Sequence, residues 1–151
     1  MPKFAITTQV SATLPEVWKN FDEKLFRQLA PPFPFIKLLR FDGCLQGNEV
    51  HLELNFIFFK QRWISKITQS YIREDEVCFV DEGKALPFFL TRWRHVHLLQ
   101  TTPEGTFIKD IITFETPSPL LNWLILPALY FQFLYRKPIY KRYFKARNSK
   151  T

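Results

Sequence analysis

The chain changes pattern once, near residue 116, and this change limits the folds that are open to it. From residue 35 to residue 115 apolar and polar residues alternate with the two-residue period of β-strands, interrupted by short turns. After residues 116–119 comes one long helical pattern, LLNWLILPALYFQFLYRKPIYKRYFKAR, with expected kinks at Pro127 and Pro138. A long antiparallel meander followed by one helix predicts an α+β fold in which the helix packs on the sheet.

The first 34 residues add a strand and two short helices. Residues 3–10 alternate as a first strand. Thr13 is the expected N-cap of one short helix and Asp22 that of a second, which the proline-rich segment 30–34 ends. This order predicts a strongly curved sheet of about six to seven antiparallel strands wrapped round the long C-terminal helix. The space between sheet and helix is where a hydrophobic ligand would bind.

Two segments of the meander give specific predictions. In residues 48–59 the even-numbered residues from Val50 to Phe58 are all apolar and are expected on one face of a strand, with a turn at 60–62. Residues 102–105, T-P-E-G, suit a β-turn with Pro103 second and Gly105 fourth. All four glycines, Gly83 among them, are expected at turns.

Composition places the chain among folded proteins of a reducing compartment. Its 151 residues suit a single domain, 1–151, and 46% of them are hydrophobic, including 17 phenylalanines. Such a number of rings needs a large core or a space walled by rings. With only Cys44 and Cys78, we expect no disulfide framework. Since the first ten residues also lack the apolar stretch of a signal peptide, we expect a cytoplasmic protein.

The net charge of +7 comes from the C-terminal segment, residues 136–151. This segment holds seven basic residues and no acidic one, while the rest of the chain is balanced. Its arginines and lysines alternate with tyrosines, so it could contact nucleic acid or an anionic membrane as well as water. We favour a transient membrane contact over nucleic acid, because a carrier of hydrophobic ligands must load and unload at membranes. For Arg136 two roles stay open, a contact with an acidic partner or simple solvation.

The sequence resembles the SRPBCC superfamily, and within it the bacterial ligand-binding SRPBCC domain proteins. The residues that carry this resemblance are FVDEGKALPFFLTRWRHVHLL (79–99), with the pattern W-x-H-x-H, and TFIKDIITFETP (106–117). Two shorter segments, LAPPFPF (29–35) and FLYRKPI (133–139), also resemble that group. One departure is Leu86, which stands where the group usually has glycine. The resemblance covers essentially the whole chain. It implies a START-like helix-grip fold with a hydrophobic cavity, and it implies no particular reaction.

The W-x-H-x-H segment contains the main candidate residues. In a strand, Trp93, His95 and His97 point to one face. If Thr102 pairs with Gly105 across the turn, His97 lies opposite Asp110 on the next strand. A carboxylate in that position would fix the imidazole tautomer and raise the pKa of His97. The favoured interpretation is a polar pair that satisfies itself in the cavity wall or on the outer face of the sheet, and the alternative is a general base.

We expect these residues and nearby rings to bind the ligand: Trp93, His95, His97, Asp110, Phe88, Phe89, Trp63 and Phe56. The favoured function is binding or transport of a lipid, isoprenoid or polyketide-like molecule. The alternative is an enzyme of the polyketide cyclase/dehydratase kind, with His97 as base and Asp110 as the group that orients it. Motifs for a nucleophilic serine, a metalloprotease or a P-loop are absent from the sequence.

A zinc site on His95 and His97, with Asp110 as a further ligand, is the metal-binding alternative, because alternate strand histidines can share a metal. No third good ligand is visible: His51 is distant in sequence, and Asp81 precedes Gly83 in an expected hairpin end. Asp81 is therefore interpreted as solvated, with a place at the cavity mouth as the alternative. We accordingly predict no metal and no cofactor.

Overall fold

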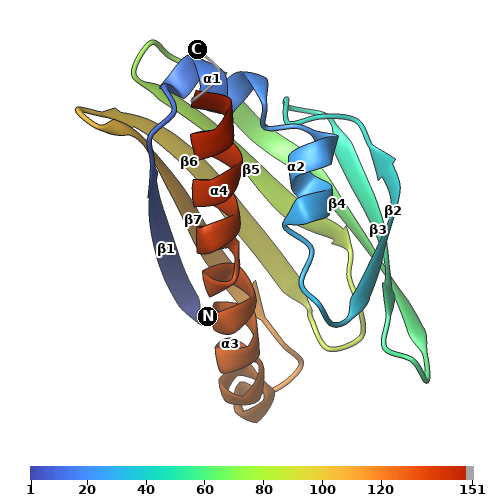
Figure 1. Ribbon diagram of the computed structural model, residues 1–151. Helices are drawn as coiled ribbons and strands as arrows, with labels where there is room; N and C mark the ends of the chain where they lie inside the picture. The colour runs from blue at the N-terminus through green and yellow to red at the C-terminus, as the bar shows by residue number, and fades with distance from the viewer. Residues whose placement is uncertain (149–151) are drawn as a thin grey trace.

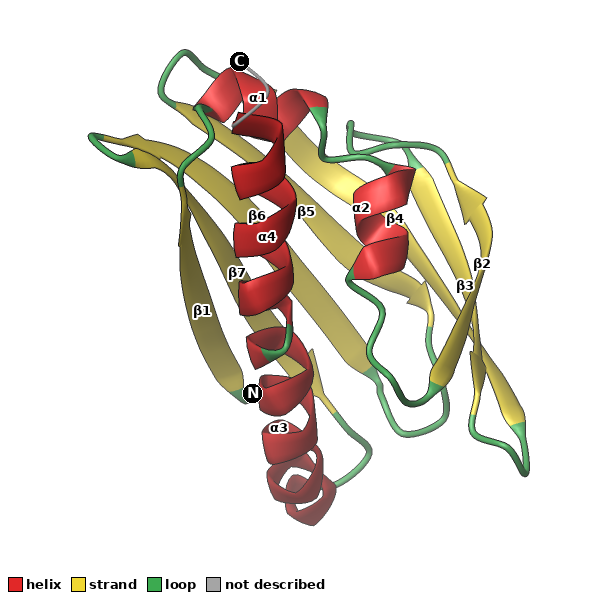
Figure 2. Cartoon of the chain, viewed as in Figure 1, coloured by secondary structure: helices red, strands yellow, loops and turns green. Residues whose placement is uncertain are grey.

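The computed structural model describes residues 1–148, which form one curved antiparallel sheet with helices on its concave side (Figures 1 and 2). The seven strands lie in the order β1-β7-β6-β5-β4-β3-β2. Their bounds are β1 Lys3–Val10, β2 Phe35–Phe41, β3 Glu49–Asn55, β4 Lys60–Ile72, β5 Glu76–Ala85, β6 Arg92–Thr102 and β7 Gly105–Glu115. The predicted helix-grip architecture is confirmed.

The two predicted short helices are α1 Leu14–Lys19 and α2 Glu23–Gln28. The Asp22 carboxylate caps α2 by accepting a hydrogen bond from the Leu25 amide at 3.0 Å, as expected. The Thr13 side chain makes no such bond, so α1 depends on its packing through Leu14 and Val17. Figure 1 shows α2 beside the C-terminal helices, over the part of the sheet formed by β3 and β4.

The predicted long C-terminal helix is present as α3 Pro119–Leu134 and α4 Arg136–Asn148, with a break at Tyr135 close to the kink expected at Pro138. Pro138 is the physical reason for the break: it has no amide hydrogen for the Leu134 carbonyl, and its ring crowds that carbonyl. The two helices still run nearly in line along the concave face (Figure 1). Within residues 1–148, no helix combines the length and apolar character needed to cross a membrane.

The hairpin after β3 differs from the prediction. β3 ends at Asn55, whose side-chain oxygen accepts a hydrogen bond from the Ile57 amide at 2.8 Å. The turn therefore occupies residues 56–59, and the predicted turn at 60–62 is the start of β4. Phe58 leaves the predicted apolar face and is 94% exposed at the tip.

Three groups of buried side chains fix the helices on the sheet. At one end, Tyr140 and Phe144 of α4 are completely buried against α1 and the sheet. In the middle, Leu129 and Phe133 of α3 pack on β6 and β7. A third group covers β3 beneath α2. Each large side chain buried in this way contributes about 1.5–3 kcal/mol, so α4 is the firmly anchored part of the C-terminal region.

The tight turn between β6 and β7 sets the register of the two central strands. Thr102 pairs with Gly105, and this places His97 opposite Asp110, as predicted from the sequence. Gly105 has a φ of +143°, and a Cβ atom there would lie 2.2 Å from the Val10 carbonyl oxygen. The turn therefore requires glycine both for its backbone conformation and for its close approach to β1.

We predict that Gly105→Ala destabilises the protein by about 3 kcal/mol or more, because backbone strain and a collision with β1 add together. Gly47→Ala is the matched control: Gly47 also has a positive φ, +93°, but open space surrounds its missing Cβ. Urea unfolding of both variants measures the difference. Equal losses of stability would show that the contact with β1 does not matter.

Candidate functional site

A cavity of about 610 Å³ lies between the concave face of the sheet and helices α2 and α3. Its walls are mainly apolar and aromatic, with Phe79 and Trp93 on the sheet and Leu129 and Phe133 on α3. Trp63 and Trp93 meet edge to face, with ring centroids 4.8 Å apart. Large rings that brace one another in this way hold the wall in a fixed shape.

The cavity brings together almost all of the predicted ligand-binding residues. Phe56, Trp63, Phe88, Phe89, Trp93, His95 and His97 line it. Asp110 does not: it is 1% exposed and lies behind His95, so its contact is with the histidines and not with the cavity. The opening is marked by Phe33, Phe59 and Phe88, which line the cavity and are also 48%, 44% and 67% exposed.

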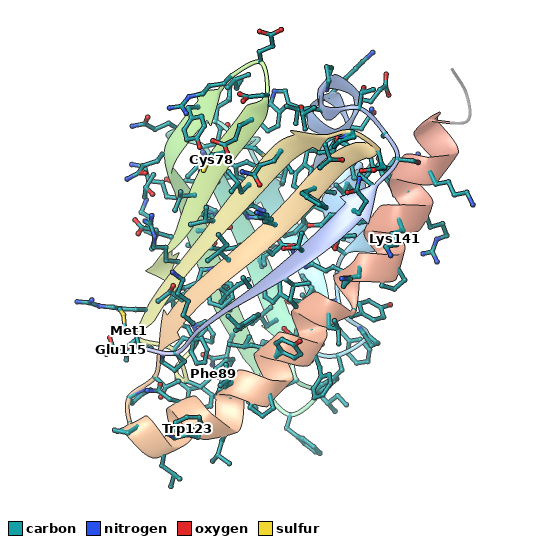
Figure 3. All side chains as sticks on the ribbon, turned by 90° about the vertical axis from the view of Figure 1, so that its left-hand side faces the viewer. Met1, Cys78, Phe89, Glu115, Trp123 and Lys141 are labelled. Atoms are coloured by element: carbon teal, nitrogen blue, oxygen red, sulfur yellow. The ribbon has the colours of Figure 1, made fainter. Side chains whose placement is uncertain are left out.

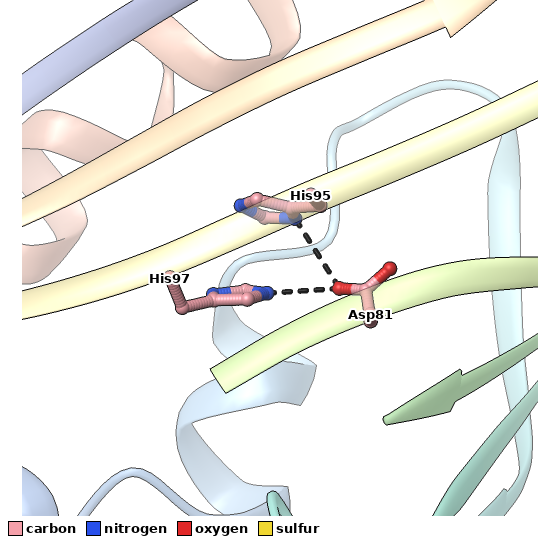
Figure 4. Close-up of side chains that lie close together, drawn as sticks. All are labelled: Asp81, His95 and His97. Carbon is pink, nitrogen blue, oxygen red and sulfur yellow. Dashed lines mark hydrogen bonds and ion pairs between the residues drawn. The ribbon is translucent and has the colours of Figure 1, made fainter. Parts of the chain in front are cut away.

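The polar part of the cavity wall is a cluster of two histidines and two aspartates on three neighbouring strands. Asp81 of β5 lies opposite His95 of β6, and His97 of β6 lies opposite Asp110 of β7. The short hydrogen bonds run diagonally: His97 Nε2 to Asp81 Oδ2 at 2.9 Å and His95 Nε2 to Asp110 Oδ1 at 2.8 Å. The directly opposite pairs are farther apart, at 3.4 Å and 3.7 Å. Figure 4 shows both imidazoles converging on one oxygen of Asp81.

Asp81 is therefore a member of the site, and its interpretation as a solvated hairpin end is wrong. β5 continues through Gly83 to Ala85, so Asp81 is inside the strand. Its side chain is 15% exposed and also accepts a hydrogen bond from Trp93 Nε1 at 3.0 Å. The sequence did contain a signal for this position: residues two apart in a strand share a face, so Asp81 is expected on the same face as Val77 and Phe79, towards the cavity.

The predicted direction of the His97 pKa is also wrong. Burial, reinforced by the neighbouring His95, lowers the pKa of His97 to about 4, and this outweighs the opposite effect of the two carboxylates. Burial acts to raise the pKa of Asp81 and Asp110, but hydrogen bonds from His97 and His95 hold both values below the ordinary 3.8. Near neutral pH the cluster thus contains two carboxylates and a neutral His97.

Arg136 and Tyr140, at the start of α4, complete the surroundings of Asp110. The Arg136 guanidinium lies 4.4 Å from the Phe133 ring centre, lines the cavity and helps to lower the pKa of Asp110. Arg136 therefore acts on an acidic residue through its charge, without an ion pair to Asp110 among the described side chains. Tyr140 is completely buried, and burial followed by the Asp110 charge raises its pKa. The sequence had given no role to Tyr140.

No family model and no curated protein matches the sequence, but solved structures resemble its fold. Protein Ms6760 from Mycobacterium smegmatis is 14% identical and aligns over 96% of this chain and 92% of its own, with a TM-score of 0.67. The Zhui aromatase/cyclase from Streptomyces sp. R1128 is 14% identical over 91% and 89%, with a TM-score of 0.69. Norcoclaurine synthase from Thalictrum flavum, in complex with dopamine and hydroxybenzaldehyde, is 12% identical over 84% and 76%, with a TM-score of 0.61.

These likenesses show the fold. The chain has the same helix-grip fold as these proteins, and this is the fold that the sequence resemblance implied. Because the identities are low, the role of the cavity has to be argued from this chain's own residues.

The low pKa of His97 predicts a pH-dependent stability. The folded-state value of about 4 lies below the ordinary 6.5, so the unfolded chain binds the proton more tightly. Stability is complete above pH 6.5 and falls by up to about 3 kcal/mol as the pH drops towards 4. Protonation of Asp81 and Asp110 lowers the stability of the folded protein further only when the pH falls below their ordinary pKa of 3.8. In chelator-containing buffer, the urea unfolding of His97→Gln should depend less on pH in this window than that of the wild type, and an unchanged pH dependence would contradict this origin of the effect.

Proposed function

We propose that the protein binds a hydrophobic small molecule in the cavity between the sheet and α3. The observation that carries this proposal is the cavity itself, with about 610 Å³ of space behind a mainly apolar wall. Small-molecule sites commonly have 300–1,000 Å³, apolar walls and a few convergent polar groups. The cluster of Asp81, His95 and His97 supplies such polar groups on one side of the space.

The wall chemistry favours an amphipathic ligand of the lipid, isoprenoid or polyketide-like class. Burial of its apolar body drives binding at roughly 25 cal/mol per Å², before the entropic cost of association. A hydroxyl, carbonyl or phenol on the ligand would be oriented by His95, His97 or Arg136, since all three border the cavity. The aromatic walls of this chain suit flat rings, and dopamine and hydroxybenzaldehyde are the molecules bound in norcoclaurine synthase.

Exposed apolar residues near the opening support transfer to and from a hydrophobic phase. Trp123 on α3 is 74% exposed and Phe88 is 67% exposed. Figure 3 shows Trp123 at the same end of the molecule as Phe89, in the loop between β5 and β6. The predicted membrane contact through residues 136–151 stays a proposal: Lys141, Arg142 and Lys145 are exposed on α4, and Lys150 lies outside the described residues.

The second candidate function is catalysis of the cyclase/dehydratase type. A buried, neutral His97 hydrogen-bonded to Asp81 favours it, as does the presence of an aromatase/cyclase and a synthase among proteins of this fold. The orienting carboxylate would then be Asp81, because Asp110 bonds to His95. In a carrier, His97→Ala mainly weakens binding, whereas in an enzyme it removes turnover and leaves binding.

We predict that Val50→Phe weakens the binding of a fluorescent hydrophobic probe by at least about 10-fold or abolishes it. Val50 lines the cavity, and the phenylalanine ring would fill part of the space that the probe needs. Val96→Phe is the matched control, since Val96 lies on the opposite face of the sheet from His95 and His97. Probe titration and far-UV circular dichroism of both folded variants give the comparison. Equal affinity in wild type and Val50→Phe would contradict the proposed cavity.

A further inference from the structure

We propose that Asp81, His95 and His97 bind a divalent transition-metal ion of the Zn²⁺ type at the wall of the cavity. One possible ligand atom from each of these three residues lies within 4.8 Å of the other two. This site goes beyond the proposed ligand binding, and it differs from the sequence prediction of no metal because the structure supplies Asp81 as the third ligand.

The two distances from Asp81 to the histidine nitrogens suit one shared ion. With bonds of about 2.1 Å, two ligand atoms are about 3.4 Å apart at a tetrahedral angle and about 3.0 Å apart at a right angle. Asp81 Oδ2 lies 3.4 Å from His95 Nδ1 and 2.9 Å from His97 Nε2. Both distances thus match ligand–ligand edges of common coordination geometries, so a small outward shift of the carboxylate makes room for the ion.

The backbone holds these donors in place. Histidines two residues apart on β6 present both imidazoles to the same face, and Asp81 lies opposite His95 on the neighbouring strand. The imidazole rings of His95 and His97 have centroids 3.6 Å apart. Since all three residues are within paired strands, the site needs no ordering of a loop.

Asp110 acts as the outer carboxylate that metal-bound histidines typically need. It accepts a hydrogen bond from His95 Nε2 at 2.8 Å, which leaves Nδ1 of the same ring directed at Asp81. Its second oxygen, Oδ2, is buried and has no hydrogen-bond partner among the described side chains, and the same is true of Nδ1 of His97. His97 Nδ1 is 3.7 Å from Asp110 Oδ1, so a slight rotation would join these two groups and free Nε2 for the metal.

The charge around Asp81 also calls for a cation. Asp110 has Arg136 nearby, but among the side chains described, those of residues 1–145, no lysine or arginine forms an ion pair with Asp81. Its neighbours are two imidazoles and the Trp93 indole. A carboxylate taken out of water is costly unless a positive charge compensates it. A bound ion supplies that charge, and its remaining coordination position faces the cavity, where water or an oxygen of the ligand can occupy it.

The test is a titration of chelator-treated, dialysed protein with Co²⁺ and Zn²⁺. We expect one Co²⁺ per chain with visible absorption bands of a low-coordinate site, displaced by Zn²⁺. Asp81→Asn, which keeps the side-chain shape, should lose the bands. Asp110→Asn should weaken binding about 10–100-fold by its effect on the histidines. His51→Ala is the matched control and should bind as the wild type does, because His51 is outside the cluster and bonds to Glu49.

Two results would overturn the metal site: a folded wild type that gives no Co²⁺ bands and no Zn²⁺ binding heat, or binding that Asp81→Asn leaves unchanged. The first result needs no variant, so it stands even where a substitution disturbs folding. Probe binding by the metal-free wild type, measured in parallel, separates this outcome from failure of the proposed ligand cavity.

Discussion

The site depends on the crossed hydrogen bonds between β5, β6 and β7. Two carboxylates and two imidazoles are withdrawn from water, and each would be costly there alone. The diagonal bonds His97–Asp81 and His95–Asp110 offset that cost, and both require β6 to be paired on each side in one register. A shift of one residue would turn both histidines to the outer face. The Gly105 turn is thus as important to the site as the histidines are.

The cavity exists because the C-terminal region is anchored unevenly. α4 is fixed by fully buried rings such as Tyr140 and Phe144, whereas α3 contacts the sheet mainly through Leu129 and Phe133 and exposes Trp123. The sheet curves away from α3 towards β3, where α2 covers it (Figure 1). A ligand would occupy the space that neither helix fills, with its polar end at the His–Asp cluster.

The strand pattern and the T-P-E-G turn were sufficient to predict the fold and the position of His97 opposite Asp110. Asp81 was misplaced because Gly83 suggested a turn. In the structure Gly83 makes room for Leu86, whose side chain would lie 2.6 Å from an added Cβ. That contact joins β5 to the following loop and has no signature in the local sequence. The pKa of His97 could not be predicted from the sequence for a similar reason. It depends on how deeply the ring is buried, and residues far away in the sequence, Phe21 and Phe79, pack against that ring.

Native mass spectrometry of the freshly purified protein, followed by organic extraction of whatever is bound, tests the central claim most directly. We expect a discrete non-covalent adduct, which extraction releases as a hydrophobic molecule with at least one polar group. The adduct should return when the extract is added to stripped, refolded protein. A bare chain mass, unchanged by added lipids, quinones or polyketide-like compounds, would contradict the claim that this cavity binds a hydrophobic ligand.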